Sequence, residues 1–259
     1  MYFPEGFRSA TVDEFVPLVN HNDTAVTYEI IARYEAGDRD ERIASGILPA
    51  GTRGGITTAA SWNPAESAIS RVGVPYAIEV RSTLPLGGTM SHYDFGVATG
   101  EAFTPEISAT WTFAEVQKFP GESLDFITWF NPGTEDALLT ITIYPAEGDT
   151  VSQVWPLSSL RRGGIDITGE PWVPQGSFSV IIESTQPIVA ALSHYEPNTG
   201  QGFIALGHPG AGTLDGAIPY VDLSNESEFI ATFFNPGDTD ATVIIETRFE
   251  TFDGGRGAA

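Results

Sequence analysis

Two histidines in matching contexts are the first residues whose types could do chemistry. His92 lies in the Ser-His-Tyr-Asp motif Ser91–Asp94, and His194 lies in the Ser-His-Tyr-Glu motif Ser193–Glu196, 102 residues later. A serine, a histidine and an acid are the parts of a nucleophilic triad. Neighbours on a strand point to opposite faces, however, so each serine cannot share a proton with the histidine beside it. We interpret His92 and His194 as structural histidines with a backbone partner or, alternatively, as contacts to a ligand.

Two tryptophans fall in corresponding loops. Trp62 follows the Arg-Gly-Gly-Ile motif Arg53–Ile56, and Trp172 follows the same motif at Arg162–Ile165. Aromatic faces on the loops of a β-sandwich are suited to stacking on sugar rings. A loop tryptophan can equally close one end of a core. The sequence leaves both alternatives open, a carbohydrate contact and a core plug.

Asparagine-led turns bring acids together at three places. The residues concerned are Asn22 and Asp23, Glu135 and Asp136, and Asp238 and Asp240. Clustered oxygen ligands suit calcium, although none of these turns has the spacing of a dedicated calcium loop. Asparagine and aspartate are also ordinary turn residues, because their side chains bond to nearby backbone. A weak calcium site and a plain turn are therefore both open, and no other cofactor is expected.

Acids also recur once per repeat near its opening. Glu5, Glu115 and Asp222 are the residues concerned. Paired carboxylates carry out glycoside hydrolysis, but an acid repeated once per domain more simply supports the fold. The sequence holds no Walker loop, dinucleotide fingerprint or nucleophile elbow. We predict no catalytic residues and a protein that is not an enzyme.

The elements that must position these residues are written three times. An apolar run, an asparagine-led turn and a second apolar run appear at Phe15–Ala25, Leu124–Ala137 and Phe229–Ala241, and the asparagines at positions 20, 131 and 235 are 111 and 104 residues apart. This period is too long for a solenoid and matches one β-sandwich domain. We predict a first repeat over 1–109, a second over 110–216, and the N-terminal part of a truncated third over 217–259.

Strands alternate with turns throughout. Apolar residues alternate in Val26–Ala32 and again in Leu139–Ile143, as half-buried strands require. No segment keeps a helical period, apart from a short helical turn expected near Glu66 to Ile69. The sequence predicts an all-β fold of tandem antiparallel β-sandwich domains. The third copy is expected to form a lone hairpin over Phe229–Phe249, which is marginal in water unless it packs or pairs with another chain.

Composition excludes several classes of partner. The chain has 34 acids against 12 bases, a net charge of −22, which repels phosphate backbones and anionic membranes. It has no cysteine, so disulfides and thiol chemistry are excluded. No apolar run of about 20 residues is present, so no membrane insertion is expected. Met1 leads straight into the first repeat without a signal peptide, and with the cut third repeat this suggests a fragment.

Part of the second repeat resembles a known family. Trp172–Val189, with its Pro-x-Gly turn and aliphatic strand ending in Glu-Ser, resembles the small soluble transducers of microbial sensory rhodopsins, as do Tyr2–Gly6 and the strand end at Phe130 and Asn131. Trp111–Glu115 is similar to the opening of tandem repeats in uncharacterised bacterial surface proteins. The resemblance implies a β-sandwich of about this size. The transducers are single-domain, cytoplasmic and oligomeric, so a tandem array fits the surface repeats better.

These observations lead to one functional expectation and two alternatives. We expect a non-enzymatic tandem module of a larger bacterial surface or secreted protein, acting as a spacer, an adhesion element or a ligand-binding unit. The alternatives are a cytoplasmic transducer-like signalling adaptor and a carbohydrate-binding module. Expected partners are other repeats of the same protein, a carbohydrate or another protein, and no nucleic acid. The expected location is extracellular or at the cell surface, with the cytoplasm as the alternative.

Overall fold

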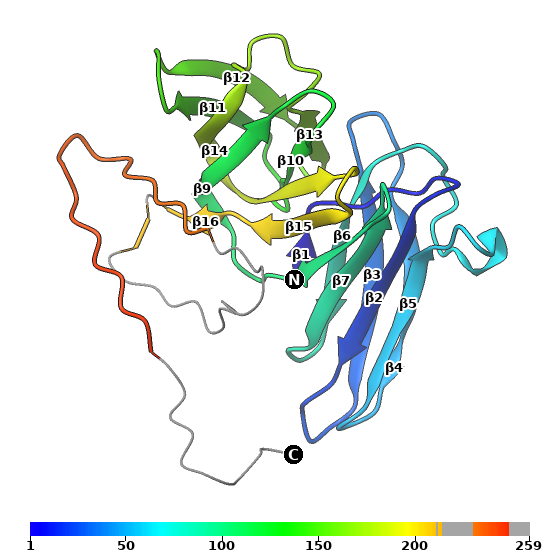
Figure 1. The fold of residues 1–259 in the computed structure, drawn as a ribbon. Coiled ribbons are helices and arrows are strands. Elements are labelled where there is room, and N and C mark those ends of the chain that lie inside the picture. The colour runs from blue at the N-terminus through cyan, green and yellow to red at the C-terminus, as the bar shows by residue number, and fades with distance from the viewer. Residues whose placement is uncertain (211, 214–229, 249–259) are drawn as a thin grey trace, which may run out of the picture.

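The protein is built from antiparallel strands (Figure 1). A computed structural model describes residues 1–210, 212–213 and 230–248. Across these residues the only helical element is the 3-10 turn η1 (Pro64–Glu66), close to the short turn expected near Glu66. The prediction of an all-β fold is confirmed. The described chain has no helix with the length and apolar character needed to cross a membrane.

Repeat 1 consists of two four-stranded sheets. Sheet A has the order β1 (Tyr2–Phe3), β6 (Tyr76–Ser82), β3 (Val26–Tyr34) and β4 (Glu41–Leu48). Sheet B has the order β5 (Arg53–Ala59), β2 (Asp13–Val19), β7 (Gly87–Asp94) and β8 (Val97–Ala102). Alternate residues of each sheet point inward, so one apolar core lies between them. Its fully buried members include Phe3, Val16, Ile30, Tyr34, Tyr76 and Ile78.

Repeat 2 is organised around one long strand, β14 (Gly176–Glu196). The first part of β14 pairs with β9 (Ser108–Lys118) and β11 (Ala137–Pro145), and β11 also pairs with β12 (Val151–Leu157). The second part pairs with β10 (Leu124–Phe130) and β15 (Gln201–Leu206). On its other side β10 pairs with β13 (Arg162–Asp166), and the short β16 (His208–Pro209) pairs antiparallel with β9. We call the layer made by β13, β10, the second part of β14, and β15 sheet D.

Strand register shows that the repeated motifs occupy equivalent places. Val19 lies opposite Arg53 in sheet B, and Phe130 lies opposite Arg162 in sheet D. The internal repeat of the sequence is therefore also a repeat of strand pairing. The exact boundaries between repeats stay predictions, because β9 runs across residue 109 and residue 216 lies outside the described chain.

The third copy differs from expectation. A hairpin was predicted from Phe229 to Phe249, but residues 230–248 contain no strand, and Phe229 and Phe249 lie outside the described residues. The turn itself is kept, because Asn235 Nδ2 donates to the Thr239 carbonyl at 2.7 Å and Asn235 Oδ1 accepts from Gly237 N at 3.1 Å. In repeat 2 the equivalent strands β10 and β11 each pair with a strand on both sides, and an unsupported two-stranded ribbon is marginal in water.

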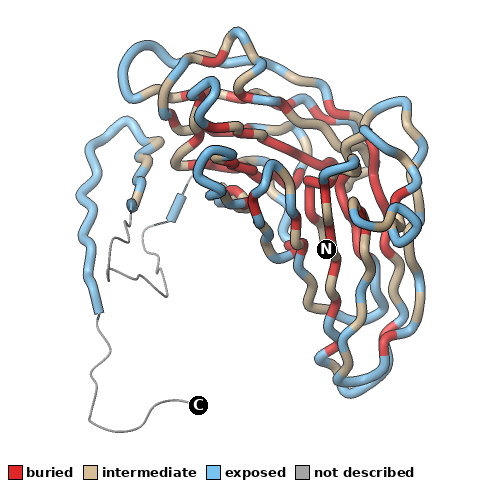
Figure 2. The backbone as a smooth tube through the Cα atoms, turned by 45° about the vertical axis from the view of Figure 1, so that its right-hand side comes forward, coloured by how far each residue is buried: buried red, intermediate tan, exposed pale blue. Residues whose placement is uncertain are grey.

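The centre of sheet D, at β10 and the second part of β14, is buried on both faces. On β10, Ile127 and Trp129 point into the core of repeat 2, while Thr128 and Phe130 are buried on the opposite face, toward repeat 1. In Figure 2 the buried residues of repeat 1 and of repeat 2 form adjoining regions of the backbone. A strand covered on both faces has a nearly continuous apolar sequence, which explains why β10 reads Leu-Asp-Phe-Ile-Thr-Trp-Phe.

Candidate functional site

The junction between the two repeats is apolar and continuous with a core. Ala191 and Ile204 of sheet D belong to the core cluster of repeat 1. The ring of Tyr2 packs on Phe130 with centroids 5.8 Å apart, and Phe95 lies nearly parallel to Phe126 at 6.4 Å. Sheet D therefore closes the end of the repeat 1 sandwich.

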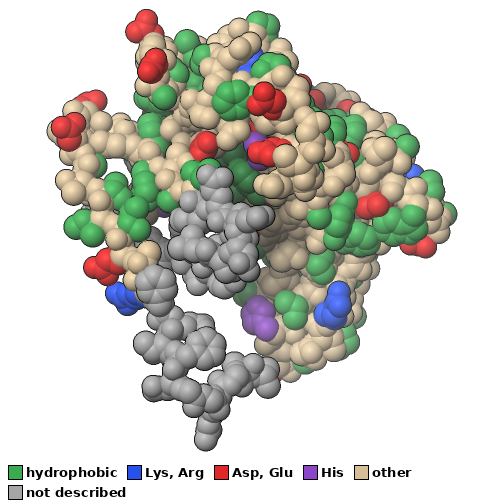
Figure 3. All heavy atoms as spheres, in the orientation of Figure 1, with side chains coloured by type: hydrophobic (Ala, Val, Ile, Leu, Met, Phe, Trp, Pro, Cys, Tyr) green, Lys and Arg blue, Asp and Glu red, His purple; other side chains and the backbone are tan. Residues whose placement is uncertain are grey.

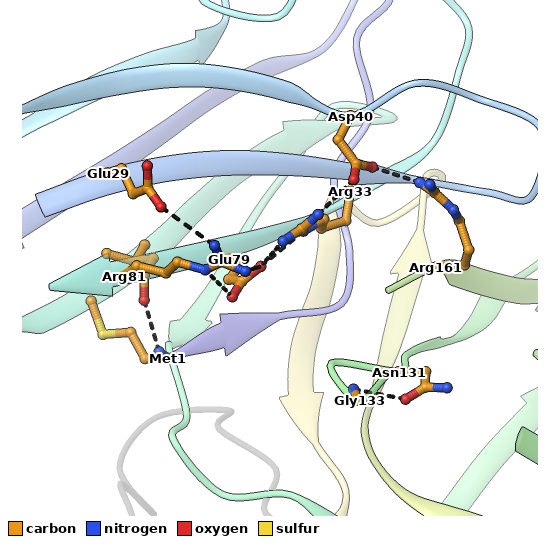
Figure 4. Close-up of polar contacts among 10 residues, drawn as sticks. Met1, Glu29, Arg33, Asp40, Glu79, Arg81, Asn131, Gly133 and Arg161 are labelled. Atoms are coloured by element: carbon orange, nitrogen blue, oxygen red, sulfur yellow. Dashed lines mark hydrogen bonds and ion pairs between the residues drawn. The ribbon is translucent and has the colours of Figure 1, made fainter. Parts of the chain in front are cut away.

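A network of ion pairs crosses the same junction (Figure 4). Arg161 Nη1 lies 2.6 Å from Asp40 Oδ1, and Arg162 Nη1 lies 2.7 Å from Glu35 Oε1. Asp40 also binds Arg33, whose guanidinium in turn binds Glu79 at 2.5 Å. Linked pairs of this kind hold geometry better than isolated surface pairs, which contribute little. The sequence singles out Arg162 only as the first residue of a repeated motif, and it gives no signal for Arg161.

A buried carboxyl lies between the repeats. Glu5 Oε1 accepts a hydrogen bond from the Tyr195 hydroxyl at 3.2 Å, whereas Glu5 Oε2 is buried with no hydrogen-bond partner in the described chain. Burial raises the pKa of Glu5, and the nearby His92 and Arg162 only partly oppose this. Burial also raises the pKa of Tyr195. Of the recurring acids, Glu5 thus has a place inside the junction, and Asp222 lies outside the described residues.

Each of the two histidines at matching repeat positions pairs with a buried carboxylate rather than with backbone. His92 Nδ1 lies 2.7 Å from Glu14 Oε1, and His194 Nδ1 lies 2.6 Å from Asp125 Oδ1. Our expectation of a backbone partner was therefore wrong. The available signal was an acid at the start of each of these strands, because Glu14 and Asp125 are 111 residues apart, the step that also relates Asn20 to Asn131.

Glu14 is the centre of a dense hydrogen-bonded group. Besides His92, its carboxylate accepts from Phe7 N at 2.8 Å, from Thr58 Oγ1 at 3.0 Å and from the hydroxyl of Tyr76. The side chain has no exposed surface. Burial and the adjacent Glu14 charge raise the pKa of Tyr76. Ser193 Oγ has no hydrogen-bond partner in the described chain, whereas the Glu14 group links β2 to β5, β6 and β7.

The histidine pairs give stability a defined pH dependence. Burial opposes protonation of His92, but the hydrogen bond and charge of Glu14 outweigh it and raise the pKa of His92. A raised folded-state pKa contributes stability that is present below the unfolded value of about 6.5 and is lost as pH rises through the folded value. The raised pKa of Glu5 acts in the same direction. We expect the free energy of unfolding to fall as the pH rises above about 6.5, by at most about 1.4 kcal/mol per pH unit per proton.

Urea unfolding of the wild type and of His92→Gln across this pH range checks the expectation. His92→Gln removes the titrating group, so its stability should depend less steeply on pH. His21→Gln is the matched control, because His21 is exposed and should keep the wild-type slope. Equal slopes for wild type and His92→Gln would contradict the assignment.

The two tryptophans have different environments. Trp62 is 54% exposed and lies nearly parallel to Phe15, with centroids 5.5 Å apart. Phe15 in turn meets the exposed Tyr93 edge-on at 6.1 Å. Trp172 is half-buried against the core of repeat 2, and its indole N–H donates to Glu170 at 3.0 Å. Trp172 therefore packs on the edge of a core, and a ligand contact stays a prediction for both tryptophans and for His92 and His194.

The asparagine turns are held by their own side chains. Asn131 is buried, its Nδ2 donates to the Glu135 carbonyl at 2.8 Å, and its Oδ1 accepts from Gly133 N at 2.9 Å (Figure 4). In repeat 1, Asn22 Nδ2 donates to Asn20 Oδ1 at 2.8 Å. These contacts are those of a turn.

The acids beside these turns do not gather. Asp136 Oδ1 accepts from Ser159 N at 2.8 Å. Five of the six proposed ligands are exposed at the surface, namely Asp23, Glu135, Asp136, Asp238 and Asp240. Over the residues that the structure describes, no three His, Asp or Glu side chains come together as a possible metal site. Calcium binding stays a prediction with no such cluster behind it.

A shallow groove of about 350 Å³ lies on the outer face of sheet A. Its walls combine hydroxyls with Tyr28, Glu29, Arg42 and Arg81. Arg81 is held by Glu79 at 2.7 Å. None of these residues was singled out from the sequence, because they come from three separate strands and share no motif.

Comparison with known proteins gives weak matches only. No family model and no curated protein matches the chain. Among solved structures, Thermotoga maritima 1070 is 20% identical over 41% of this chain and 97% of its own, with a TM-score of 0.37. The Anabaena sensory rhodopsin transducer is 26% identical over 32% of this chain and 91% of its own, with a TM-score of 0.29. The transducer resemblance is therefore present as a weak structural similarity.

Proposed function

We propose that this chain is a non-enzymatic tandem module in which two β-sandwich repeats act as one stiff unit, serving as a spacer or adhesion element of a larger bacterial surface or secreted protein. The observation that carries the proposal is sheet D, which is buried on one face in its own repeat and on the other against repeat 1. Junctions between domains of one chain are usually polar and allow relative motion. This junction instead joins a sheet of one repeat to the core of the next.

Bending at the junction would carry a high cost. It would expose Phe130, Ala191 and Ile204 to water, which opposes the hydrophobic effect, and it would separate Arg161 from Asp40 and Arg162 from Glu35. A spacer needs this resistance to bending, because its task is to hold what it carries at a fixed distance. The high negative charge supports solubility of such an array.

Two other functions stay alternatives. The groove on sheet A, with Tyr28 and two arginines, supports a carbohydrate-binding module. A cytoplasmic signalling adaptor is suggested by nothing more than the resemblance to the sensory rhodopsin transducers. Neither involves the junction between the repeats, so a test of stiffness addresses the first proposal directly.

Stiffness can be measured as a distance distribution. The chain contains no cysteine, so Ile47→Cys and Val154→Cys, at exposed positions of β4 and β12, place one spin label in each repeat. We expect double electron–electron resonance to give a single narrow distribution of distances between the two labels. It should be no wider than the distribution for Ile47→Cys with Thr89→Cys, which both lie in repeat 1. A broad distribution for the pair across the junction would contradict the proposal.

A further inference from the structure

The outer face of sheet B is the counterpart of the junction face of sheet D. Phe15 and Val19 stand 111 residues before Phe126 and Phe130. Val19 is 44% exposed whereas Phe130 is 0% exposed. The same contrast holds on β7, where Tyr93 is 43% exposed and its counterpart Tyr195, 102 residues later, is 1% exposed. One face thus occurs twice, once covered by repeat 1 and once open.

The open face also carries the matching charge. In sheet D, Arg162 binds Glu35 of the preceding repeat at 2.7 Å. Its counterpart Arg53, 109 residues earlier, is exposed at the same position opposite Val19. No ion pair joins Arg53 to any residue that the structure describes. The face therefore presents a cation where its covered counterpart meets an acid.

Hydrophobic side chains gather on this face. Trp62 lies on Phe15, and Phe15 meets Tyr93, so three aromatic rings adjoin there. Figure 3, in the orientation of Figure 1, shows hydrophobic side chains on the side of the molecule where Figure 1 places β5 and β2. Exposed apolar clusters rimmed by polar residues are typical of interaction surfaces.

We propose that the open face of sheet B binds the repeat 2 end of a second copy of this chain, head to tail, as sheet D binds repeat 1. The inference rests on the proposed function as a tandem module and names its partner. The loop after β11 supplies the chemistry required, because Glu147 and Asp149 are exposed there. It is the counterpart of the loop at Glu35, since Gly37 and Gly148, 111 residues apart, both have a positive φ of 91° and 102°.

A second observation concerns what already packs on this end of repeat 2, namely residues of the third copy that correspond to residues of β10. Phe234 stands 104 residues after Phe130, and its ring packs on Tyr144 at the end of β11, with centroids 5.1 Å apart. Thr232, 104 residues after Thr128, donates a hydrogen bond to Glu115. A second copy would displace this segment of the third copy. It would replace a segment without strands by the complete sheet B.

Charge and symmetry define how the assembly should behave. Each copy carries a net charge of −22, so association is opposed at low salt and favoured once the repulsion is screened, over about 8 Å at 0.15 M salt. The two surfaces are different, so the contact is heterologous and generates open chains rather than closed dimers.

Analytical ultracentrifugation of the full chain tests the proposal at about 0.15 M and about 0.5 M NaCl. We expect species beyond the monomer that grow with concentration without stopping at a dimer. Tyr93→Glu places a charge in the centre of the contact and should weaken association at least about tenfold. Val154→Glu, on an exposed site of β12, is the matched control and should leave association unchanged.

A charge exchange identifies the two surfaces. Arg53→Glu should weaken association, and so should the double variant Glu147→Lys with Asp149→Lys. A mixture of the two should associate again, because the reversed charges then meet. Restoration in the mixture is a result that loss of folding cannot produce.

Several outcomes would overturn the proposal. The first is a monomer at every concentration and salt, and the second is association that neither Tyr93→Glu nor Arg53→Glu weakens. A glycan that binds only when Trp62 is present, without self-association, would assign the face to carbohydrate instead. Each of these leaves the proposed function standing if the distance distribution across the junction is narrow, and a broad distribution would refute that function separately.

Discussion

Glu14→Ala is expected to lower the free energy of unfolding by about 3 to 5 kcal/mol, the cost of breaking a buried charged network by removing one partner. The side chain has no exposed surface. Its removal leaves His92, Thr58 and the Tyr76 hydroxyl without their common acceptor. Buried groups that lose a hydrogen-bond partner keep their full desolvation cost, so the loss should be much larger than that of one bond.

Urea unfolding of Glu14→Ala and Glu29→Ala separates this effect from a general loss of charge. Glu29 is a partly exposed acid on β3 that lies 3.5 Å from Arg81. Exposed pairs contribute about 0 to 1 kcal/mol, so Glu29→Ala should change stability little. A comparable small loss for Glu14→Ala would show that the buried network does not stabilise repeat 1.

Phe130→Ala is expected to cost about 3 to 5 kcal/mol, the range for truncating a buried phenylalanine. Phe130 is fully buried on the face of sheet D that meets repeat 1, where it contacts Tyr2. Its removal opens a cavity between the repeats rather than inside one of them. We therefore also expect the two repeats to lose cooperativity, so that one unfolding transition becomes two.

Val19→Ala is the control that the internal repeat provides. Val19 occupies the same repeat position in sheet B and is 44% exposed, so its truncation should stay within about 0.5 kcal/mol, as for most surface substitutions. Calorimetry and urea unfolding measure both variants. Equal losses for Phe130→Ala and Val19→Ala, or an unchanged single transition in Phe130→Ala, would show that sheet D is not coupled to repeat 1.

Sequence patterns predicted most of the fold because strand alternation and turn chemistry are local. The asparagine turns and the alternating strand at Leu139–Ile143 are present in the structure. The third hairpin failed because its stability depends on neighbouring strands, which no local pattern reports. The nearly continuous apolar run of β10 is typical of a strand buried on both faces, but nothing in the sequence indicates that repeat 1 supplies the second cover.

The candidate site was predicted less well for a related reason. His92 and His194 were found, but their carboxylate partners come from strands 78 and 69 residues away, and only the shared offset linked them. Trp62 and Trp172 looked equivalent by motif, although one is exposed and the other half-buried. The pairing of Arg162 with Glu35 spans 127 residues and follows from how the repeats pack rather than from either segment.

The two-sided burial of sheet D sets the order in which the two repeats can finish folding during synthesis. Repeat 1 leaves the ribosome first, yet two members of its core, Ala191 and Ile204, lie in the strands of sheet D. The nascent first sandwich therefore keeps an open apolar end until β14 and β15 have been made, roughly 100 residues later at about 5 to 20 residues per second. For several seconds the emerging chain offers this end to chaperones or to neighbouring nascent chains, and completion of the second repeat closes it.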